Sequence, residues 1–417
     1  MSGLCLVPDH SLTERLAQHL LRAVDGPMRG RARLHLLDWM GCVAGARHGP
    51  VAAVMRRSDH PATLRAAMLG NVLEMDDVHR AAILHPGPVI WPAVLGRSGQ
   101  GMAAMLDAAV RGYEATIAIG ATFDAAHYGY WHNTTTAGLF GSAAAVSSLL
   151  GADATILTSA LGLAGSVSGG FWQMRHEPVM AKQWHIAHAV RTGAAAAQDA
   201  AIGMTGPRFV LEGAQGVYAA TCHAPKPLQL AAGWRMAEVS FKPWGACRHA
   251  HPAIDAALAL RARGTLTLPV TVETFADALA FCDSPHPATP HQAKFSIQHA
   301  VAVVMMRGEP TLEDFEAESI AALADARAGV LVRENPAITA RYPDHFGATV
   351  IAETDRESVV DTLGDPERPL SRDGVIAKAR ALFAWGELSD AQAQRGLTLA
   401  LDGDDADGVV SWLDEIL

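Results

Sequence analysis

Residues 137–170 leave this chain few choices of fold. Alanine, serine and glycine alternate there with leucine, valine and isoleucine, and the run is interrupted by Gly151, Ala152 and Asp153, a helix stop followed by a helix N-cap. Small side chains allow the backbones of two helices to approach each other closely. The run therefore predicts two closely packed, buried helices, and Asp153 and the serines favour a helical core in water over one in a membrane.

Helical signals continue on both sides of this run. Only 6% of the residues are aromatic, and runs of β-branched residues are few, which favours helices over strands. Ser11 and Glu14 fit a capping box and so predict an early helix. A further helix is expected over residues 181–201, because glycine and proline interrupt the chain at 203–207.

The pattern changes after about residue 239. β-like segments at 271–275 and 348–352 lie between helical stretches at 253–262 and 295–306, and helical patterning returns over residues 365–417. We therefore predict a mainly α fold in three segments: helical at 1–238, α+β at 239–364, and helical at 365–417. A cleft for a small ligand is expected where the α+β unit meets the helices.

The overall composition excludes several classes of protein. A net charge of −10 and a pI near 6.0 oppose a binder of nucleic acid or of anionic membranes, because both need a basic surface. The chain lacks an apolar run of about 18 residues that would span a membrane. Its first six residues lack the basic start of a secretory signal, so a cytoplasmic protein is expected. Five scattered cysteines, Cys5 among them, fit neither a disulfide framework nor a structural zinc site.

The densest group of polar residues follows position 73. Three carboxylates, at Glu74, Asp76 and Asp77, shortly precede His85 in an otherwise apolar region. A magnesium–diphosphate site would need another carboxylate one helical turn after Asp76, where Arg80 stands, and the spacing H-E-x-x-H of a zinc site is absent. A solvated helix end with capping aspartates is the ordinary alternative, and the sequence leaves it open.

Three further groups combine basic and aromatic residues. Tyr130 and His132 precede three threonines at a helix start, where free amides favour an anion. Lys182 begins an alanine-rich segment that has little other reason to carry a charge. A packed aromatic loop and a lysine at the edge of the surface are the ordinary alternatives for these two groups. The third group is a basic cluster, made of Lys242, Arg248, His249 and His251.

Taken in order, these motifs resemble the MmgE/PrpD family. The resemblance runs from the acidic motif at 74–77 with His85, through His132, Lys182 and the segments 205–207 and 212–213, to residues 242–255. The family includes 2-methylcitrate dehydratase, cis-aconitate decarboxylase and iminodisuccinate epimerase. The resemblance implies a large all-helical domain built from the N- and C-terminal segments, a smaller α+β lid domain, a homodimer, and an active site between domain and lid with no metal and no organic cofactor.

The resemblance also places the family's site residues in this sequence. Its active-site histidines fall at His85 and His132, its lysines at Lys182 and Lys242, and its lid histidine at His251. The expected catalytic residues are His85, His132, Lys182 and Tyr130. The expected substrate-binding residues are Glu74, Asp77, Lys242, Arg248, His251 and His299. Three positions depart from the family's usual pattern, with Glu74, Val78 and His299 in place of an aspartate, a threonine and a tyrosine.

The chemistry that the resemblance implies is proton removal from, or addition to, a carbon next to a carboxylate. Cationic side chains would neutralise the substrate's carboxylates and the charge of the transition state, and histidine has a suitable pKa for proton transfer. We expect a lyase acting on a small polycarboxylate, with dehydration of a citrate- or 2-methylcitrate-type acid ranked first.

Three alternatives to dehydration are kept. Epimerisation of an aspartate-like diacid of the iminodisuccinate type needs two groups on opposite faces of one carbon, and Tyr130 is available as a partner of Lys182. Decarboxylation of a cis-aconitate-like acid ranks next. Because of the departures at Val78 and His299, a homodimer that only binds a carboxylate is the non-catalytic alternative.

Overall fold

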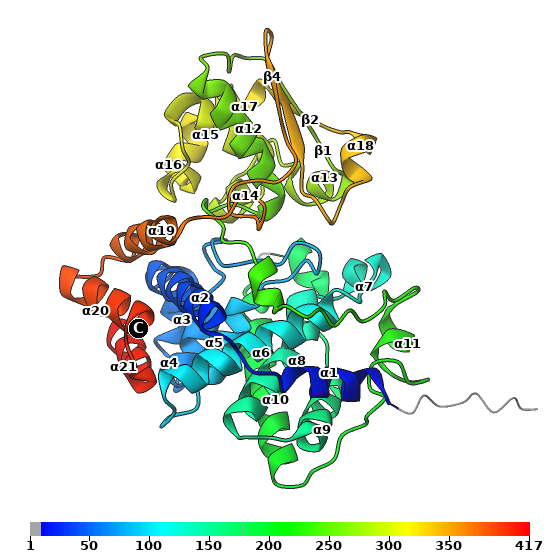
Figure 1. Cartoon of the computed structure of the whole chain (residues 1–417). Coiled ribbons are helices and arrows are strands. Elements are labelled where there is room, and N and C mark those ends of the chain that lie inside the picture. The colour runs from blue at the N-terminus through cyan, green and yellow to red at the C-terminus, as the bar shows by residue number, and fades with distance from the viewer. Residues whose placement is uncertain (1–9, 178) are drawn as a thin grey trace, which may run out of the picture.

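The computed structural model describes residues 10–177 and 179–417. The predictions for the first six residues and for Cys5 lie outside these ranges. Two large hydrophobic cores divide the chain: one joins residues between Leu16 and Val239 with residues between Ala379 and Ile416, and the other joins residues between Trp244 and Val350. Figure 1 shows the corresponding parts, which we call the helical unit and the α+β unit, one above the other. The predicted mainly α fold is confirmed, while the boundaries at 238 and 364 stay predictions.

The helical unit begins with a long series of helices. In chain order they are α1 (Leu12–Leu20), α2 (Gly26–Gly45), α3 (Pro50–Met55), α4 (Ala62–Leu69), α5 (Gly87–Leu95), α6 (Met102–Gly120), α7 (Ala125–Tyr130), α8 (Asn133–Leu149), α9 (Ala154–Ser166), α10 (Ala181–Ala201) and α11 (Val217–Thr221), with short 3-10 turns η1 (Trp172–His176) and η2 (Arg235–Glu238). The expected capping box of Ser11 and Glu14 starts α1.

Small residues let α8 pack tightly between α6 and α10. A Cβ atom added at Gly141 of α8 would lie 1.8 Å from Thr116 Oγ1 of α6, and one added at Gly193 of α10 would lie 2.4 Å from the main-chain oxygen of Leu139. The side chain of Asp153 caps α9, accepting hydrogen bonds of 2.9 Å from the main-chain amides of Thr155 and Ile156. The prediction of two buried helices over residues 137–170 is therefore confirmed.

The α+β unit is built on a four-stranded mixed sheet in the order β2-β1-β3-β4. Strand β1 (Val270–Thr274) runs parallel to β2 (Val330–Glu334) and antiparallel to β3 (Ala348–Ile351), which pairs antiparallel with β4 (Arg356–Val359). Val272 stands opposite both Val332 and Val350 and is fully buried, because α12 (His251–Ala262) and α15 (Ile297–Arg307) pack against the sheet. The remaining elements are η3 (Arg248–Ala250), α13 (Ala276–Cys282), α14 (Pro290–Lys294), η4 (Glu313–Phe315), α16 (Ala317–Ala322), α17 (Ala324–Ala328) and α18 (Pro336–Thr339).

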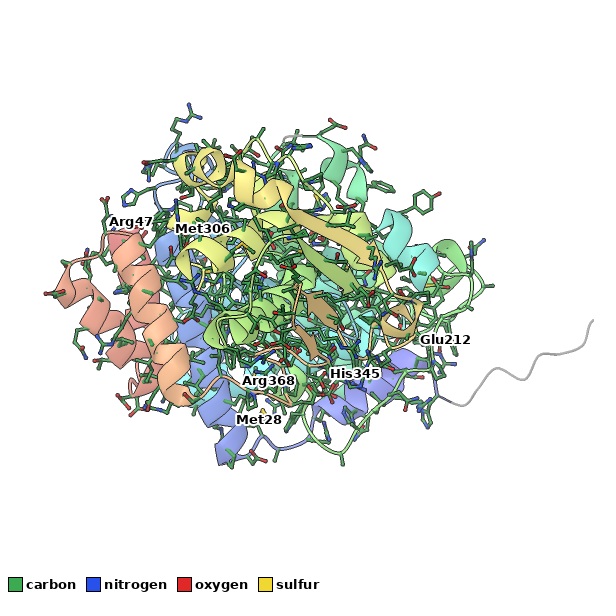
Figure 2. The ribbon with its side chains drawn as sticks, turned by 90° about the horizontal axis from the view of Figure 1, so that it is seen from above. Met28, Arg47, Glu212, Met306, His345 and Arg368 are labelled. Atoms are coloured by element: carbon green, nitrogen blue, oxygen red, sulfur yellow. The ribbon has the colours of Figure 1, made fainter. Side chains whose placement is uncertain are left out.

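The last three helices return to the helical unit. Helices α19 (Arg372–Trp385) and α20 (Asp390–Leu401) pack against α2, and α21 (Ala406–Ile416) packs against α4 and α5. Seen from above, the α+β unit covers the helical unit and these last helices lie along one side (Figure 2). Across the described residues, we find no helix with the length and apolar character that crossing a membrane requires.

Candidate active site

The acidic motif lies in an irregular segment between α4 and α5 that the loop carrying Lys242 holds in place. Val78 donates a main-chain hydrogen bond of 3.1 Å to Ser240, and Ser240 returns one of 2.8 Å. This antiparallel bridge joins segments that are more than 150 residues apart. It brings Glu74 and Asp76 beside Lys242, two residues beyond Ser240.

Ion pairs with little exposure to solvent connect the motif to the two predicted lysines. Glu74 accepts a hydrogen bond from Lys182, the second residue of α10. Lys242 Nζ lies 3.6 Å from Glu74 Oε2 and 3.5 Å from Asp76 Oδ1, and the Lys242 side chain is 0% exposed. His85 completes the group, with Nδ1 2.9 Å from Asp76 Oδ2. Among the expected residues, the structure therefore brings together Glu74, His85, Lys182 and Lys242, and it adds Asp76.

The charges in this cluster stabilise each other. Burial opposes the charged form of Glu74, but Lys182, Lys242 and His85 outweigh it and lower the pKa of the Glu74 carboxyl. Burial likewise opposes the charged form of Asp76, and His85 and Lys242 lower its pKa. Burial opposes the charged form of Lys182 as well, yet Glu74 and Asp76 raise the pKa of its amine. At neutral pH the cluster therefore holds an ammonium group at Lys182 against ionised carboxylates.

His132 adds an uncharged imidazole beside this cluster. It is the N-cap of α8, its main-chain nitrogen donates to Gly170, and its Nδ1 lies 3.0 Å from Thr135 Oγ1. Burial, followed by the charges of Lys182 and neighbouring histidines, lowers the pKa of His132 well below its usual value. Its ring lies 4.6 Å from that of Trp172 and 5.7 Å from that of His185. A neutral imidazole close to a charged lysine suits proton transfer.

The structure does not bring the other expected residues into this cluster. The Asp77 carboxylate accepts hydrogen bonds from Tyr113 Oη (2.7 Å) and Gly87 N (2.9 Å), and it lies 2.8 Å from His35 Nδ1. The Asp77 side chain thus points into the helical core, whereas the Asp76 side chain points to Lys242 and His85. Tyr130 is 73% exposed, and its side chain makes no hydrogen bond to another described residue. The pairing of Tyr130 with Lys182 is therefore absent from this arrangement.

The expected residues of the α+β unit are also held elsewhere. Arg248 pairs with Asp365, and His251 lies 3.1 Å from Arg248 Nη1 and 3.1 Å from the main-chain oxygen of Ala246. His299 Nε2 lies 2.7 Å from the main-chain oxygen of Asp314, and its Nδ1 lies 3.2 Å from Arg327 Nη1. His299 therefore belongs to the interior of the α+β unit, which explains why a histidine fits there.

Two site residues, both lysines, were missed in the sequence. Lys294 of α14 donates to the main-chain oxygen of Leu73, and Lys378 of α19 donates to that of Met75. The chain has only five lysines among its 33 basic residues, and all five are described. Four of them contact residues 73–76: Lys182, Lys242, Lys294 and Lys378. The rarity of lysine beside abundant arginine is the signal that would have found the two missed residues.

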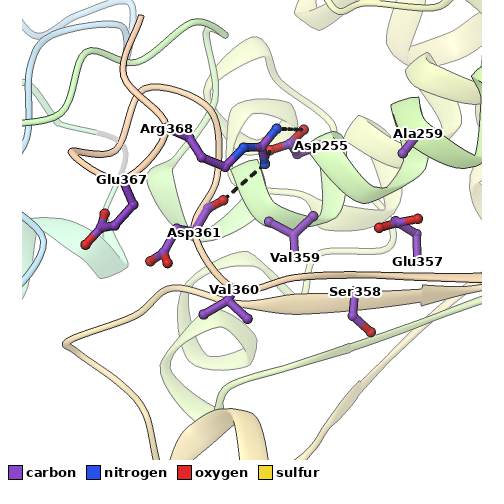
Figure 3. A pocket seen from close by; sticks show the side chains of 9 residues that line it. All are labelled: Asp255, Ala259, Glu357, Ser358, Val359, Val360, Asp361, Glu367 and Arg368. Atoms are coloured by element: carbon purple, nitrogen blue, oxygen red, sulfur yellow. Dashed lines mark hydrogen bonds and ion pairs between the residues drawn. The ribbon is translucent and has the colours of Figure 1, made fainter.

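A cavity of about 370 Å³ lies elsewhere and has the wrong charge for an acidic ligand (Figure 3). It lies between α12, β4 and the segment that leads to α19. Its lining includes four carboxylates, of Asp255, Glu357, Asp361 and Glu367. Arg368 pairs with Asp255. His345, Asp361 and Glu367 come close enough to share a cation, but Arg80 already pairs with both carboxylates.

The fold and the site together define a class of protein: a helical unit covered by a smaller α+β unit, with a buried lysine, carboxylate and histidine cluster where they meet. The chain belongs to the MmgE/PrpD family. The model of the MmgE/PrpD N-terminal domain matches residues 56–229, and the model of the C-terminal domain matches residues 244–402. The family resemblance of the motifs is thereby confirmed.

Two curated proteins show the extent of similarity. Human cis-aconitate decarboxylase is 27% identical over 198 residues, which are 44% of this chain and 40% of the human protein. The match to it thus spans well under half of the human protein's length. The cis-aconitate decarboxylase-like protein oryM of Aspergillus oryzae is 24% identical over 379 residues, which are 81% of this chain and 76% of that protein.

Proposed function

We propose that this protein is a lyase that moves a proton at a carbon next to a carboxylate of a small polycarboxylate. One observation carries the proposal: the ammonium groups of half-buried Lys182 and fully buried Lys242 lie in one cluster with the imidazoles of His85 and His132. The ammonium groups match the carboxylates of such a substrate and the charge that develops in its transition state. The imidazoles and the Lys182 amine match the proton transfer.

The environments of these groups suggest different roles. Lys182 is protonated at neutral pH, since Glu74 and Asp76 raise its pKa, so it carries a proton that it can deliver and we assign it as the proton donor. His132 is uncharged, so we assign it as the proton acceptor. Lys242 is fully buried and has no hydrogen-bond acceptor within reach among the described residues, only carboxylate oxygens at 3.5 and 3.6 Å. We assign it to the binding of a substrate carboxylate, which must enter against Glu74 and Asp76.

Decarboxylation of a cis-aconitate-like acid is the reaction to test first, because the similar human protein carries that name. In this reaction the bond between a CH₂ carbon and its carboxylate breaks and carbon dioxide leaves. The electron pair forms a new double bond, and the far carbon of the old double bond takes a proton, here from Lys182. Dehydration, ranked first from the sequence, becomes second. Epimerisation ranks lower because Tyr130 is exposed and its side chain makes no hydrogen bond to Lys182.

Proton NMR of the EDTA-treated protein in deuterium oxide tests the proposal. The panel contains cis-aconitate, citrate, 2-methylcitrate and iminodisuccinate. Release of carbon dioxide with deuterium incorporation supports decarboxylation, a new olefinic signal from the hydroxy acids supports dehydration, and interconversion of diastereomers supports epimerisation. A silent panel combined with a raised melting temperature for one of the acids would support the carboxylate-binding homodimer instead. The homodimer and the cytoplasmic location stay predictions, and light scattering tests the first.

A further inference from the structure

Two buried lysines hold the main chain on either side of Glu74. Lys294 Nζ donates to the main-chain oxygen of Leu73 at 3.1 Å, and Lys378 Nζ donates to that of Met75 at 2.5 Å. Between these contacts Glu74 has a φ of 56°, in the left-handed region that a residue with a side chain seldom adopts. Such a conformation persists where the surroundings hold it in place, and here two ammonium groups do so.

The two lysines differ in how their charge is compensated. Lys378 lies 2.6 Å from the carboxylate of Asp38, so it belongs to a buried ion pair of the helical unit. Lys294 is 6% exposed and has no carboxylate within ion-pair distance among the described residues. Burial lowers the pKa of Lys294 to about 8. A buried, unpaired amine costs folding free energy, so stability alone would favour an apolar residue at this position.

Lys294 also comes from the other unit. It ends α14 of the α+β unit, and its side chain reaches the acidic motif of the helical unit. Its main-chain oxygen accepts a hydrogen bond of 2.8 Å from Cys247, in the loop that follows Lys242. Lys294 thus contacts both the loop that follows Lys242 and the backbone next to Glu74. Glu74 is in turn the ion-pair partner of Lys182.

We propose that Lys294 is a positioning residue that holds the Glu74 carboxylate against Lys182. Because Lys294 belongs to the α+β unit, this arrangement depends on how that unit packs against the helical unit. The catalytic importance of Lys182 rests on the proposed function. The position of the Glu74 carboxylate does not depend on that function, so it is tested separately.

The first experiment measures the NMR signal and the pKa of the Lys182 amine directly. Lysine labelled with ¹³C at Cε gives at most five side-chain signals in this chain, and a pH titration of each signal yields the pKa of its amine. In Lys294→Met we expect the Lys182 signal to shift and its pKa to fall, because the Glu74 carboxylate that raises that pKa is no longer held against it. Lys226→Met is the matched control, since Lys226 is exposed and lies outside the cluster.

Kinetics on the substrate found by the NMR panel form the second experiment. We expect kcat of Lys294→Met to fall by about tenfold or more with KM changed less than about threefold, because the residue touches no substrate. Lys294→Gln, which keeps a donor group, should recover part of both the kcat and the Lys182 signal. If no acid in the panel is turned over, the proposed function fails, and the Lys182 titration still decides this inference.

Two results would overturn the proposed role of Lys294. One is a folded Lys294→Met whose Lys182 signal and pKa match those of the unchanged protein, or change no more than in Lys226→Met. The other is loss of folding in both Lys294→Met and Lys294→Gln, which would assign the residue to stability alone.

Discussion

His85 Nδ1 lies 2.9 Å from Asp76 Oδ2 and within 3.0 Å of the main-chain oxygen of Asp77. Both neighbours are hydrogen-bond acceptors, so Nδ1 carries the hydrogen and Nε2 is the nitrogen left for a substrate. The His85 side chain is 19% exposed, whereas Asp76 is buried. Asp76 therefore orients the ring, and the ring is the part of this pair that solvent reaches.

Removing the Lys182 amine or the His85 imidazole should abolish most of the activity without unfolding the protein. For Lys182→Ala and His85→Ala we expect turnover to fall by about 10²- to 10⁴-fold, the range for lost acid–base groups. Circular dichroism and a melting curve check the fold, and Lys226→Ala serves as control. Full activity of both variants on the true substrate would refute the site.

Substitution of Asp76 should mainly affect activity, whereas substitution of Asp77 should mainly affect stability. Asp76→Asn removes the charged partner of His85 and should lower kcat more than the melting temperature. Asp77→Asn weakens a buried acceptor shared by Tyr113 and His35 and should cost about 1–3 kcal/mol of unfolding free energy. Urea denaturation and steady-state kinetics on both variants test this, and the reverse pattern would contradict the assignment.

Stability should decline as the pH falls below 6.5, partly through buried His127. Burial lowers its pKa to about 4, so between pH 6.5 and 4 the unfolded chain binds more protons than the folded one. Linkage then predicts that this group's contribution is complete above pH 6.5 and about 2 kcal/mol smaller at pH 5. His127→Phe, which retains stacking on Phe123, should lose less stability between pH 7 and 5 than the unchanged protein, as measured by urea unfolding.

The tight packing of α8 against α6 can be tested with one methyl group. Gly141→Ala places a Cβ 1.8 Å from Thr116 Oγ1, which forces a shift in a close-packed core and should cost about 1–3 kcal/mol. Gly129→Ala in α7 is the matched control, because no atom lies within 4 Å of its added Cβ. Equal melting temperatures for the two variants would contradict this packing.

Much of the fold follows from patterns that act over short distances. The run at 137–170 predicted α8 and α9, and the capping box predicted α1, because periodicity and capping depend on residues a few positions apart. The four-stranded sheet was foreseen only as scattered β-like segments, since its order β2-β1-β3-β4 depends on pairings between strands distant in the chain.

Residue types alone establish the kinds of chemistry available here, because they set charge and pKa: acidic residues at 74–77, His85, His132 and two of the lysines. Which of these groups meet depends on how the chain packs in three dimensions. The bridge between Val78 and Ser240 brings Lys242 to Glu74, the backbone turns Asp77 away from Asp76, and α14 and α19 deliver Lys294 and Lys378. Ion pairs and hydrogen bonds act over a few ångströms, whereas distances across a fold are set by packing, which no local pattern encodes.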